Sequence, residues 1–376
     1  MSSSQELYNR LYGTLKDLVP VSNQKQLTNW IWIVVGLLLG RSPALSQIAN
    51  YLPMKTEAES RVTLIRRWLA NLHVEVAGFY EPIVAHLLHN WAAVEAYVIL
   101  DGVMVFGDRW QIFRLSLQHG GRAIPLAWVV VPGKGLTQVE TLTAMLTRVA
   151  TILRHRVKRV VFLADRGFRD CDWAKLCRKL GWHYAIRVAC NTYLMLADGR
   201  TGRIDTFVPS GQNRYFHNVW LTQEAKLLTN VSVTWTMDAQ DQAELVAVIS
   251  DRPACRARLA DYARRMSIEQ SFRDDKSGGF EMGHIQLQHA ERIERLLLAM
   301  AIATLWCHEL GEDLLNEGDA ARRQIDPGPT RELSIFQLGL RWLKRALATN
   351  IGAVPMFQAR LSHLSLPPVV FHPSPG

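Results

Sequence analysis

The spacing of apolar residues divides the chain into a helical part and a part that alternates strands and helices. Residues 1–92 repeat apolar positions every three to four residues, as amphipathic helices do. From Glu95 the pattern changes, and "AYVILDGVMVFG", "WQIFRLSLQ" and "AIPLAWVVV" predict three strands joined by tight turns. Four further elements are then predicted in the order helix, strand, helix and strand, in "TQVETLTAMLTRVATILRHR", "RVVFLAD", "CDWAKLCRKLG" and "WHYAIRV".

This order of elements is typical of a ribonuclease-H-like α/β domain, in which a mixed sheet has helices on both faces. Residues 93–187 and 253–310 are expected to form that domain. Between them, residues 188–252 return to strand patterning and predict an antiparallel β insertion. Residues 311–376 are expected to be a C-terminal helical region that serves dimerisation and ends in the Pro-containing tail "LPPVVFHPSPG".

The N-terminal region, residues 1–92, is expected to be an all-helical DNA-binding domain. Its segments "SPALSQIANYLP" and "TEAESRVTLIRRWLANLH" predict a short helix followed by a longer one, an arrangement that resembles a helix-turn-helix. The exposed side of the second helix carries the candidate DNA contacts Arg61, Arg66 and Arg67. The alternative is an ordinary helical bundle with a basic rim.

Composition narrows the class of partner. The 376 residues carry a formal charge of +9, which favours a polyanion and above all nucleic acid, although a merely basic enzyme is the alternative. Five cysteines without a CxxC pair argue against a disulfide framework or a structural zinc site, so a reducing cytoplasm fits best. The longest apolar runs, Trp30–Gly40 and Leu296–Cys307, are too short to span a bilayer.

Three acidic residues are candidates for catalysis. Asp101 lies inside the first predicted strand and Asp165 ends the fourth, and these strands are neighbours in a ribonuclease-H-like sheet. Glu269, on a later helix, completes a trio. Clustered carboxylates repel one another unless a cation lies among them, and two Mg²⁺ or Mn²⁺ ions suit phosphoryl transfer. The alternatives are a structural turn aspartate at Asp101 and a helix N-cap at Asp165.

The segment "YARRMSIEQSFRDDKSGGF" predicts a helix with an unusual face. Tyr262, Arg265, Glu269 and Lys276 are offset by three, seven and fourteen residues, which places them within about 60° of one another. Arg273 lies almost on the same face and adds a candidate phosphate contact. The alternative is an intrahelical salt bridge without a ligand.

The spacing Tyr-x2-Arg-x3-Glu-x6-Lys resembles the signature of bacterial insertion-sequence DDE transposases. The resemblance implies that Asp101, Asp165 and Glu269 bind two Mg²⁺ ions. It implies that Tyr262, Arg265 and Lys276 grip phosphates at the transposon end. It also implies that water nicks the DNA and that the freed 3′-OH attacks a second strand, in several members through a hairpin end. One departure is Val103, where many relatives have a small hydroxylated residue.

Two tryptophans of the predicted insertion resemble residues that stack on a flipped base in some of these enzymes. Trp235 is the better candidate and Trp220 the other, with an ordinary core or surface role as the alternative. His86, His89, His284 and His289 lack a third ligand at metal spacing and are interpreted as surface histidines.

The resulting prediction is a cut-and-paste DDE transposase that acts on double-stranded DNA at its own terminal inverted repeats as a homodimer. The alternative is a catalytically inactive or domesticated DNA-binding regulator. A ribonuclease-H-like nuclease that only hydrolyses is a third reading, which the predicted phosphate-gripping residues argue against.

Overall fold

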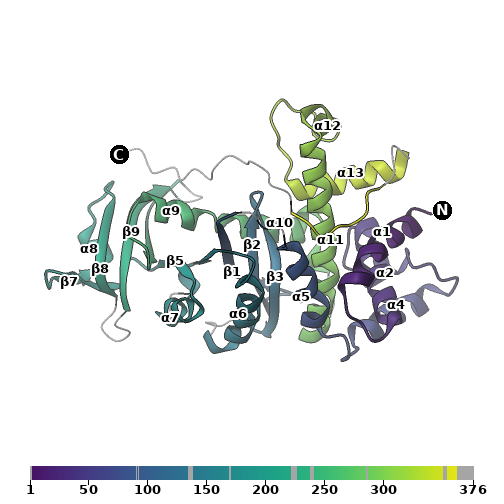
Figure 1. Ribbon diagram of the computed structural model, residues 1–376, viewed down its shortest axis with the longest axis horizontal. Helices are drawn as coiled ribbons and strands as arrows, with labels where there is room; N and C mark the ends of the chain where they lie inside the picture. Colours follow the sequence, from purple (N-terminus) through teal and green to yellow (C-terminus); the bar gives the residue numbers. More distant parts are fainter. Residues whose placement is uncertain are drawn as a thin grey trace.

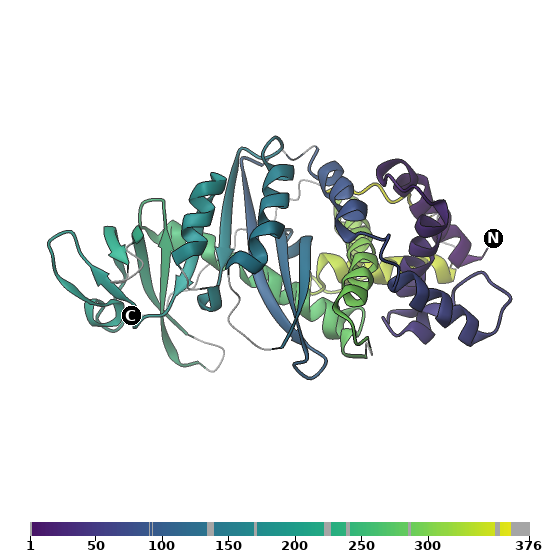
Figure 2. The same cartoon turned by 90° about the horizontal axis from the view of Figure 1, so that it is seen from below.

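The chain forms an elongated molecule with a helical end, a central sheet and a β-rich end, as the computed structural model shows (Figures 1 and 2). The structure describes residues 2–89, 91, 93–133, 139–168, 171–221, 227–237, 241–284, 287–349 and 354–361. The Pro-containing tail lies outside the described residues.

The N-terminal end is helical, as the apolar spacing predicted. Side chains of Ser2 and Asn23 cap the first two helices by accepting hydrogen bonds from backbone N–H groups. The second helix is apolar on almost every side and is correspondingly buried in the bundle. The helices are α1 (Ser3–Leu18), α2 (Gln24–Gly40), α3 (Leu45–Ala49), α4 (Ala58–Leu69) and α5 (Val76–Leu87).

The centre of the molecule is one ten-stranded sheet in the described residues, with strand order β3-β2-β1-β4-β5-β10-β9-β8-β6-β7. The first three strands pair antiparallel, whereas β1, β4 and β5 run parallel. This mixed arrangement confirms the predicted ribonuclease-H-like sheet. The strands of this half are β1 (Glu95–Val105), β2 (Trp110–His119), β3 (Arg122–Pro132), β4 (Arg159–Ala164) and β5 (His183–Val188).

The strands of residues 188–252 extend the same sheet. β10 pairs antiparallel with β5, so the strands of the predicted insertion continue the central sheet without a break. This continuation depends on pairing between distant segments, which the local pattern of the sequence does not contain. The elements are β6 (Tyr193–Met195), β7 (Thr201–Arg203), α8 (Ile204–Phe207), β8 (Arg214–Leu221), β9 (Leu227–Met237) and β10 (Ala243–Ser250).

Helices cover both faces of the first half of the sheet. α6 (Val139–Leu153) and α7 (Cys171–Leu180) lie on one side, and α9 (Arg256–Ala263) and α10 (Met266–Arg273) lie on the other (Figure 1). The long helix α11 (Ala290–Asn316) packs between β3, the N-terminal helices and α13 (Ile335–Thr349). Gly311 and Gly339 allow close contact between α11 and α13, because an added Cβ at either would overlap a backbone carbonyl.

The helix predicted from Tyr262 to Lys276 is not continuous. α9 ends at Ala263, and Arg265 and Ser267 donate backbone hydrogen bonds to residues three positions earlier, as in a tighter 3₁₀ turn. α10 follows, and Lys276 lies in a π-helical turn, Asp274–Gly278. The prediction of one straight helix was therefore wrong. The local sequence is helical in pattern throughout, and the bend accompanies contacts of Asp261 and Arg265 with β1.

No described helix combines the length and the apolar character that a membrane span requires. The two apolar runs, Trp30–Gly40 and Leu296–Cys307, lie in α2 and α11 and are largely buried, as predicted. The short helix α12 (Asp319–Arg323) links α11 to α13.

Candidate active site

The two candidate aspartates lie side by side at the sheet. Leu100 of β1 pairs in parallel register with Ala164 of β4, so Asp101 and Asp165 come next at the same level of adjacent strands. Asp101 Oδ1 accepts a hydrogen bond from Gly102 N at 2.8 Å. Asp165 Oδ1 accepts one from Gly167 N at 2.6 Å and so caps the short 3₁₀ turn that follows. The capping role considered for Asp165 is thus present, alongside its position next to Asp101.

Arg265 connects β1 to α10. Its Nη1 donates to Asp101 Oδ2 at 2.8 Å, and its Nη2 donates to Glu269 Oε1. The Arg265 side chain is 8% exposed and that of Asp101 15%, whereas Glu269 keeps 43% of its side chain in solvent. The guanidinium therefore lies between two of the three candidate carboxylates, and we call this arrangement the Arg265 bridge.

The three carboxylates share one electrostatic environment. The pKa of Asp101 is raised to about 6. Burial is the largest cause, the Arg265 charge and the Gly102 N–H oppose it, and the charges of Asp165 and Glu269 add to it. Burial alone would lower the pKa of Arg265, but Tyr262, Asp101 and the other two carboxylates hold it above its ordinary value. Three carboxylates therefore act on the single positive charge of Arg265.

The donor set fits a hard divalent cation by its chemistry, since three carboxylates whose charges oppose one another favour an ion among them. The side chains are not, however, arranged around an ion in this structure. Among the described residues, no group of three or more His, Cys, Asp or Glu side chains is arranged to hold a metal ion. In this structure the Arg265 guanidinium lies between Asp101 and Glu269 and hydrogen-bonds to both.

The remaining motif residues differ in exposure. Tyr262 is buried, its ring lies 5.8 Å from the Arg265 guanidinium, and its hydroxyl interacts with Arg187 of β5. Burial raises the pKa of Tyr262, so its hydroxyl stays protonated at neutral pH. Lys276 and Arg273 are exposed. Sequence reasoning missed Arg187, which also pairs with Glu244 of β10, although an arginine inside the apolar "YAIRV" was a usable signal.

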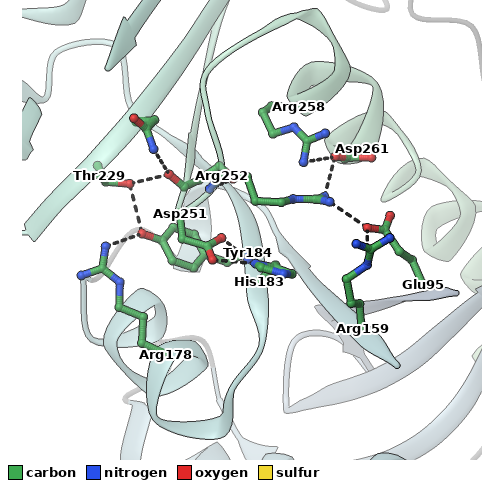
Figure 3. A network of polar contacts seen from close by, with 12 residues as sticks. Glu95, Arg159, Arg178, His183, Tyr184, Thr229, Asp251, Arg252, Arg258 and Asp261 are labelled. Atoms are coloured by element: carbon green, nitrogen blue, oxygen red, sulfur yellow. Dashed lines mark hydrogen bonds and ion pairs between the residues drawn. The ribbon is translucent and has the colours of Figure 1, made fainter. Parts of the chain in front are cut away.

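A second polar cluster surrounds Glu95 and Arg252 (Figure 3). Glu95 and Tyr97 are on the same face of β1 as Asp101, because side chains alternate along a strand. Arg252 Nη1 donates to Glu95 Oε1 and its Nη2 to Asp261 Oδ2, both at 2.8 Å. The hydroxyl of Tyr97 contacts Asp261 Oδ1 at 2.8 Å and Glu95 Oε2 at 2.9 Å. Arg258 lies 3.0 Å from Asp261. We call this arrangement the Arg252 bridge; it fixes α9 to β1 one helical turn before Arg265.

The two tryptophan candidates lie in different environments. Trp235 of β9 is on the face that carries the buried Val231 and Val233, and its Nε1 donates to Pro209 O at 2.9 Å. Trp220 of β8 is 40% exposed and pairs across strands with Leu228, which is also exposed. A stacking role for Trp235 stays a prediction, and exposure favours Trp220.

The N-terminal arginines also differ. Arg61 donates to Ala49 O at 2.9 Å and to Thr56 O, which ties α4 to the segment before it. Arg66 pairs with Glu59 at 3.0 Å on the surface, and Arg67 is exposed. Their contact with DNA stays a prediction.

Comparison with known proteins gives one family match. Residues 123–306 match the family model described as "Transposase DDE domain". This region is similar to a transposase DDE domain. The matched range covers just under half the chain and contains Asp165, Glu269 and the whole Tyr-Arg-Glu-Lys motif, whereas Asp101 precedes it.

The other comparisons add little to the DDE match. None of the curated proteins compared with the chain matches it. Among solved structures, the chain resembles the cryo-EM structure of a piggyBac transposase synaptic complex with hairpin DNA, with 8% sequence identity and a TM-score of 0.44. That alignment covers 97% of this chain and 87% of the other.

Proposed function

We propose that this protein is a DDE transposase that cleaves DNA at the terminal inverted repeats of an insertion sequence and joins the freed ends to a target. The observation that carries the proposal is the parallel register of β1 and β4, which brings Asp101 beside Asp165 while α10 brings Glu269 to the same charge cluster. The match of residues 123–306 to a transposase DDE domain supports it.

In this proposal Asp101, Asp165 and Glu269 hold Mg²⁺, with Mn²⁺ as a substitute. Two bound ions supply an activated attacking oxygen and stabilise the leaving oxygen of a phosphodiester. The carboxylates are suited to this because Asp101 and Asp165 are fixed on neighbouring strands, whereas the exposed Glu269 side chain can adjust. A nearby cation would favour the ionised form of Asp101, whose pKa burial raises.

In the same proposal the Arg265 guanidinium has a second role, as a DNA contact. When Arg265 releases Asp101 and Glu269, its guanidinium is free to bind a DNA phosphate with two N–H donors. Tyr262 remains a neutral donor beside it, and the exposed Lys276 and Arg273 add positive charge along the backbone of the DNA end. Arg265 thus neutralises the site before substrate binds and contacts substrate afterwards.

Double-stranded DNA is the proposed partner at two places, the active site and the exposed side of α4. The formal charge of +9 supports binding to a polyanion, and Arg67 is the best-placed of the three arginines of α4 because the other two make contacts within the protein. The proposed homodimer would pair two transposon ends, with the C-terminal helices as the dimerisation region.

A catalytically inactive DNA-binding regulator is the second candidate. One observation favours it: Arg265 occupies the position between Asp101 and Glu269, and the described carboxylates are not arranged around an ion. If the Arg265 bridge is permanent, the chain binds DNA without cutting it.

A nicking assay separates the two candidates. Labelled linear DNA that carries the inverted repeats flanking the gene is incubated with the protein in Mg²⁺, in Mn²⁺ and in EDTA. The transposase account predicts nicks at the repeat ends with either ion, none in EDTA, and none with Asp165→Ala. DNA binding with no nick under any condition would leave only the regulator.

A further inference from the structure

Two ion pairs that the catalytic proposal does not use hold the turn that carries Lys276. Arg114 Nη2 of β2 donates to Asp275 Oδ2 at 2.6 Å, and the two side chains are only 6% and 7% exposed. Arg122 Nε of β3 donates to Asp274 Oδ2 at 2.7 Å, again with little exposure. We call these the clamp pairs. They join neighbouring strands to two consecutive residues of the π-helical turn Asp274–Gly278.

The first clamp pair lies next to the candidate catalytic centre. Arg114 is the cross-strand partner of Asp101 in the β1–β2 register, so the two side chains project from the same face of the sheet. The Arg114 guanidinium also lies 4.9 Å from the centre of the Phe272 ring, in the last turn of α10. Arg114 therefore contacts both the end of the helix that carries Glu269 and the turn that follows it.

The clamp pairs hold Asp274 and Asp275 against the sheet and leave the next residue, Lys276, on the outside. Asp274 and Asp275 both point to the sheet, where Arg122 and Arg114 bind them. Lys276, the next residue, is exposed. A further contact, from Ala123 N to Ser271 Oγ at 2.8 Å, fixes the preceding turn of α10 to β3.

Stability alone is a poor reason for burying such charges. Replacing a buried ion pair with apolar residues of similar volume is often neutral or stabilising, whereas charged partners dictate which way a segment docks. We propose that Arg114, Asp275, Arg122 and Asp274 are positioning residues that fix the π-helical turn so that Lys276 faces a DNA phosphate. This inference rests on the proposed transposase function, and assigns Lys276 a position that depends on the clamp pairs.

The test uses the salt dependence of DNA binding, measured in EDTA so that no cleavage occurs. The whole chain is titrated against a duplex that carries the inverted repeat flanking the gene. The dissociation constant is measured at several salt concentrations. Each phosphate contact contributes about 0.9 to the slope of log affinity against log salt. Lys276→Gln is expected to lower the slope by about that amount. The double variant R114Q/D275N, whose neutral side chains can still hydrogen-bond, is expected to lower it equally.

The triple variant R114Q/D275N/K276Q decides the mechanism. If the clamp acts through Lys276, the triple variant has the same slope as Lys276→Gln. The matched control is D172N/K175Q, which removes a surface ion pair of 2.8 Å on α7, on the opposite face of the sheet, and is expected to leave the slope unchanged. Because R114Q/D275N removes a deeply buried pair, the more exposed R122Q/D274N serves as the second variant, with the same expected loss.

Three outcomes would overturn the inference. A wild-type slope in folded clamp variants would show that the pairs only stabilise the fold, and a further loss in the triple variant would show that they do not act through Lys276. An unchanged slope in Lys276→Gln would remove the phosphate contact itself. The transposase proposal is tested by a different measurement: it fails if the wild-type protein does not nick the DNA in Mn²⁺.

Discussion

Two arginines bridge β1 to the α9–α10 segment in the same way, yet their surroundings differ. Arg252 joins Glu95 of β1 to Asp261 of α9, and Arg265 joins Asp101 of β1 to Glu269 of α10. Each bridge therefore contains one strand carboxylate, one helix carboxylate and one guanidinium.

The difference lies in what else binds the carboxylates. Burial alone would raise the pKa of Glu95, but the hydrogen bond from Tyr97 and the charges of Arg252 and Arg159 outweigh it and hold that pKa below its usual range. At the Arg265 bridge burial outweighs the charge of Arg265, and the charges of Asp165 and Glu269 add to the effect of burial, so the pKa of Asp101 rises to about 6. The surroundings of Glu95 therefore favour its ionised form, whereas those of Asp101 disfavour it.

We interpret the Arg252 bridge as structural and the Arg265 bridge as part of the proposed catalytic site. The Arg252 bridge fixes α9 to the sheet, and Arg159 and Arg258 lie beside its two carboxylates (Figure 3). The Tyr97 hydroxyl contacts both carboxylates as well. At the Arg265 bridge, one turn later, a divalent cation would favour the ionised form of Asp101. Experiments that act on matching residues of the two bridges test this interpretation.

The largest expected difference is in catalysis. Asp101→Asn should reduce nicking by at least about a thousandfold, because it removes a proposed metal ligand. Glu95→Gln, at the other β1 carboxylate, should retain nicking in the folded protein. The measurement is the single-turnover nicking rate of both variants after circular dichroism has confirmed their folding. Equal loss in both would remove the distinction between the bridges.

The next effect is on stability. Arg252→Gln leaves two partly buried carboxylates without their shared cation and should cost about 3 kcal/mol. Mn²⁺ should not restore that loss. Arg265→Gln should also destabilise the ion-free protein, but there Mn²⁺ should recover the difference. Urea unfolding with and without Mn²⁺ measures both, and recovery of Arg252→Gln by Mn²⁺ would contradict the assignment.

A smaller effect is expected on ion affinity. Arg265→Gln should tighten Mn²⁺ binding about tenfold in the absence of DNA, since one competing positive charge is removed from the carboxylates. Arg166→Gln is the matched control, because Arg166 adjoins Asp165 but is 65% exposed and lies 3.8 Å from Glu244 instead. Calorimetric titration measures both affinities. A similar gain in the control would indicate a general charge effect.

The smallest effect is a difference in pH dependence. Asp101 has a raised pKa in the folded state, so its contribution to stability is lost as pH rises from about 3.8 to about 6. Glu95 has a lowered pKa, so its contribution is present above the ordinary value near 4.5 and is lost as pH falls below it. Asp101→Asn and Glu95→Gln should therefore change the pH profile of the melting temperature in opposite directions. Changes of the same sign would be inconsistent with the two environments.

Much of the fold follows from local patterns. The three apolar runs after residue 94 and the two later ones predicted β1 to β5 in the right order, because buried strands require continuous apolar sequence. Aspartates inside or at the end of such runs, at positions 101 and 165, were visible for the same reason. A carboxylate in an apolar strand needs a partner.

The features that the sequence did not predict depend on contacts between distant segments. The bend between α9 and α10 accompanies the contacts of Asp261 with Tyr97 and of Arg265 with Asp101, each linking residues 164 positions apart. The face on which Trp235 lies depends on the pairing of β9 with its neighbours, which includes a register shift in β8. The domain boundaries stay a prediction.

The most direct test of the central claim is a crystal structure of the protein with Mn²⁺ and an uncleaved DNA end, with the ions located by anomalous scattering. The account predicts Mn²⁺ among Asp101, Asp165 and Glu269, with the Arg265 guanidinium turned from these carboxylates to a DNA phosphate. An intact Arg265 bridge at saturating Mn²⁺, with no ion at the three carboxylates, would contradict it.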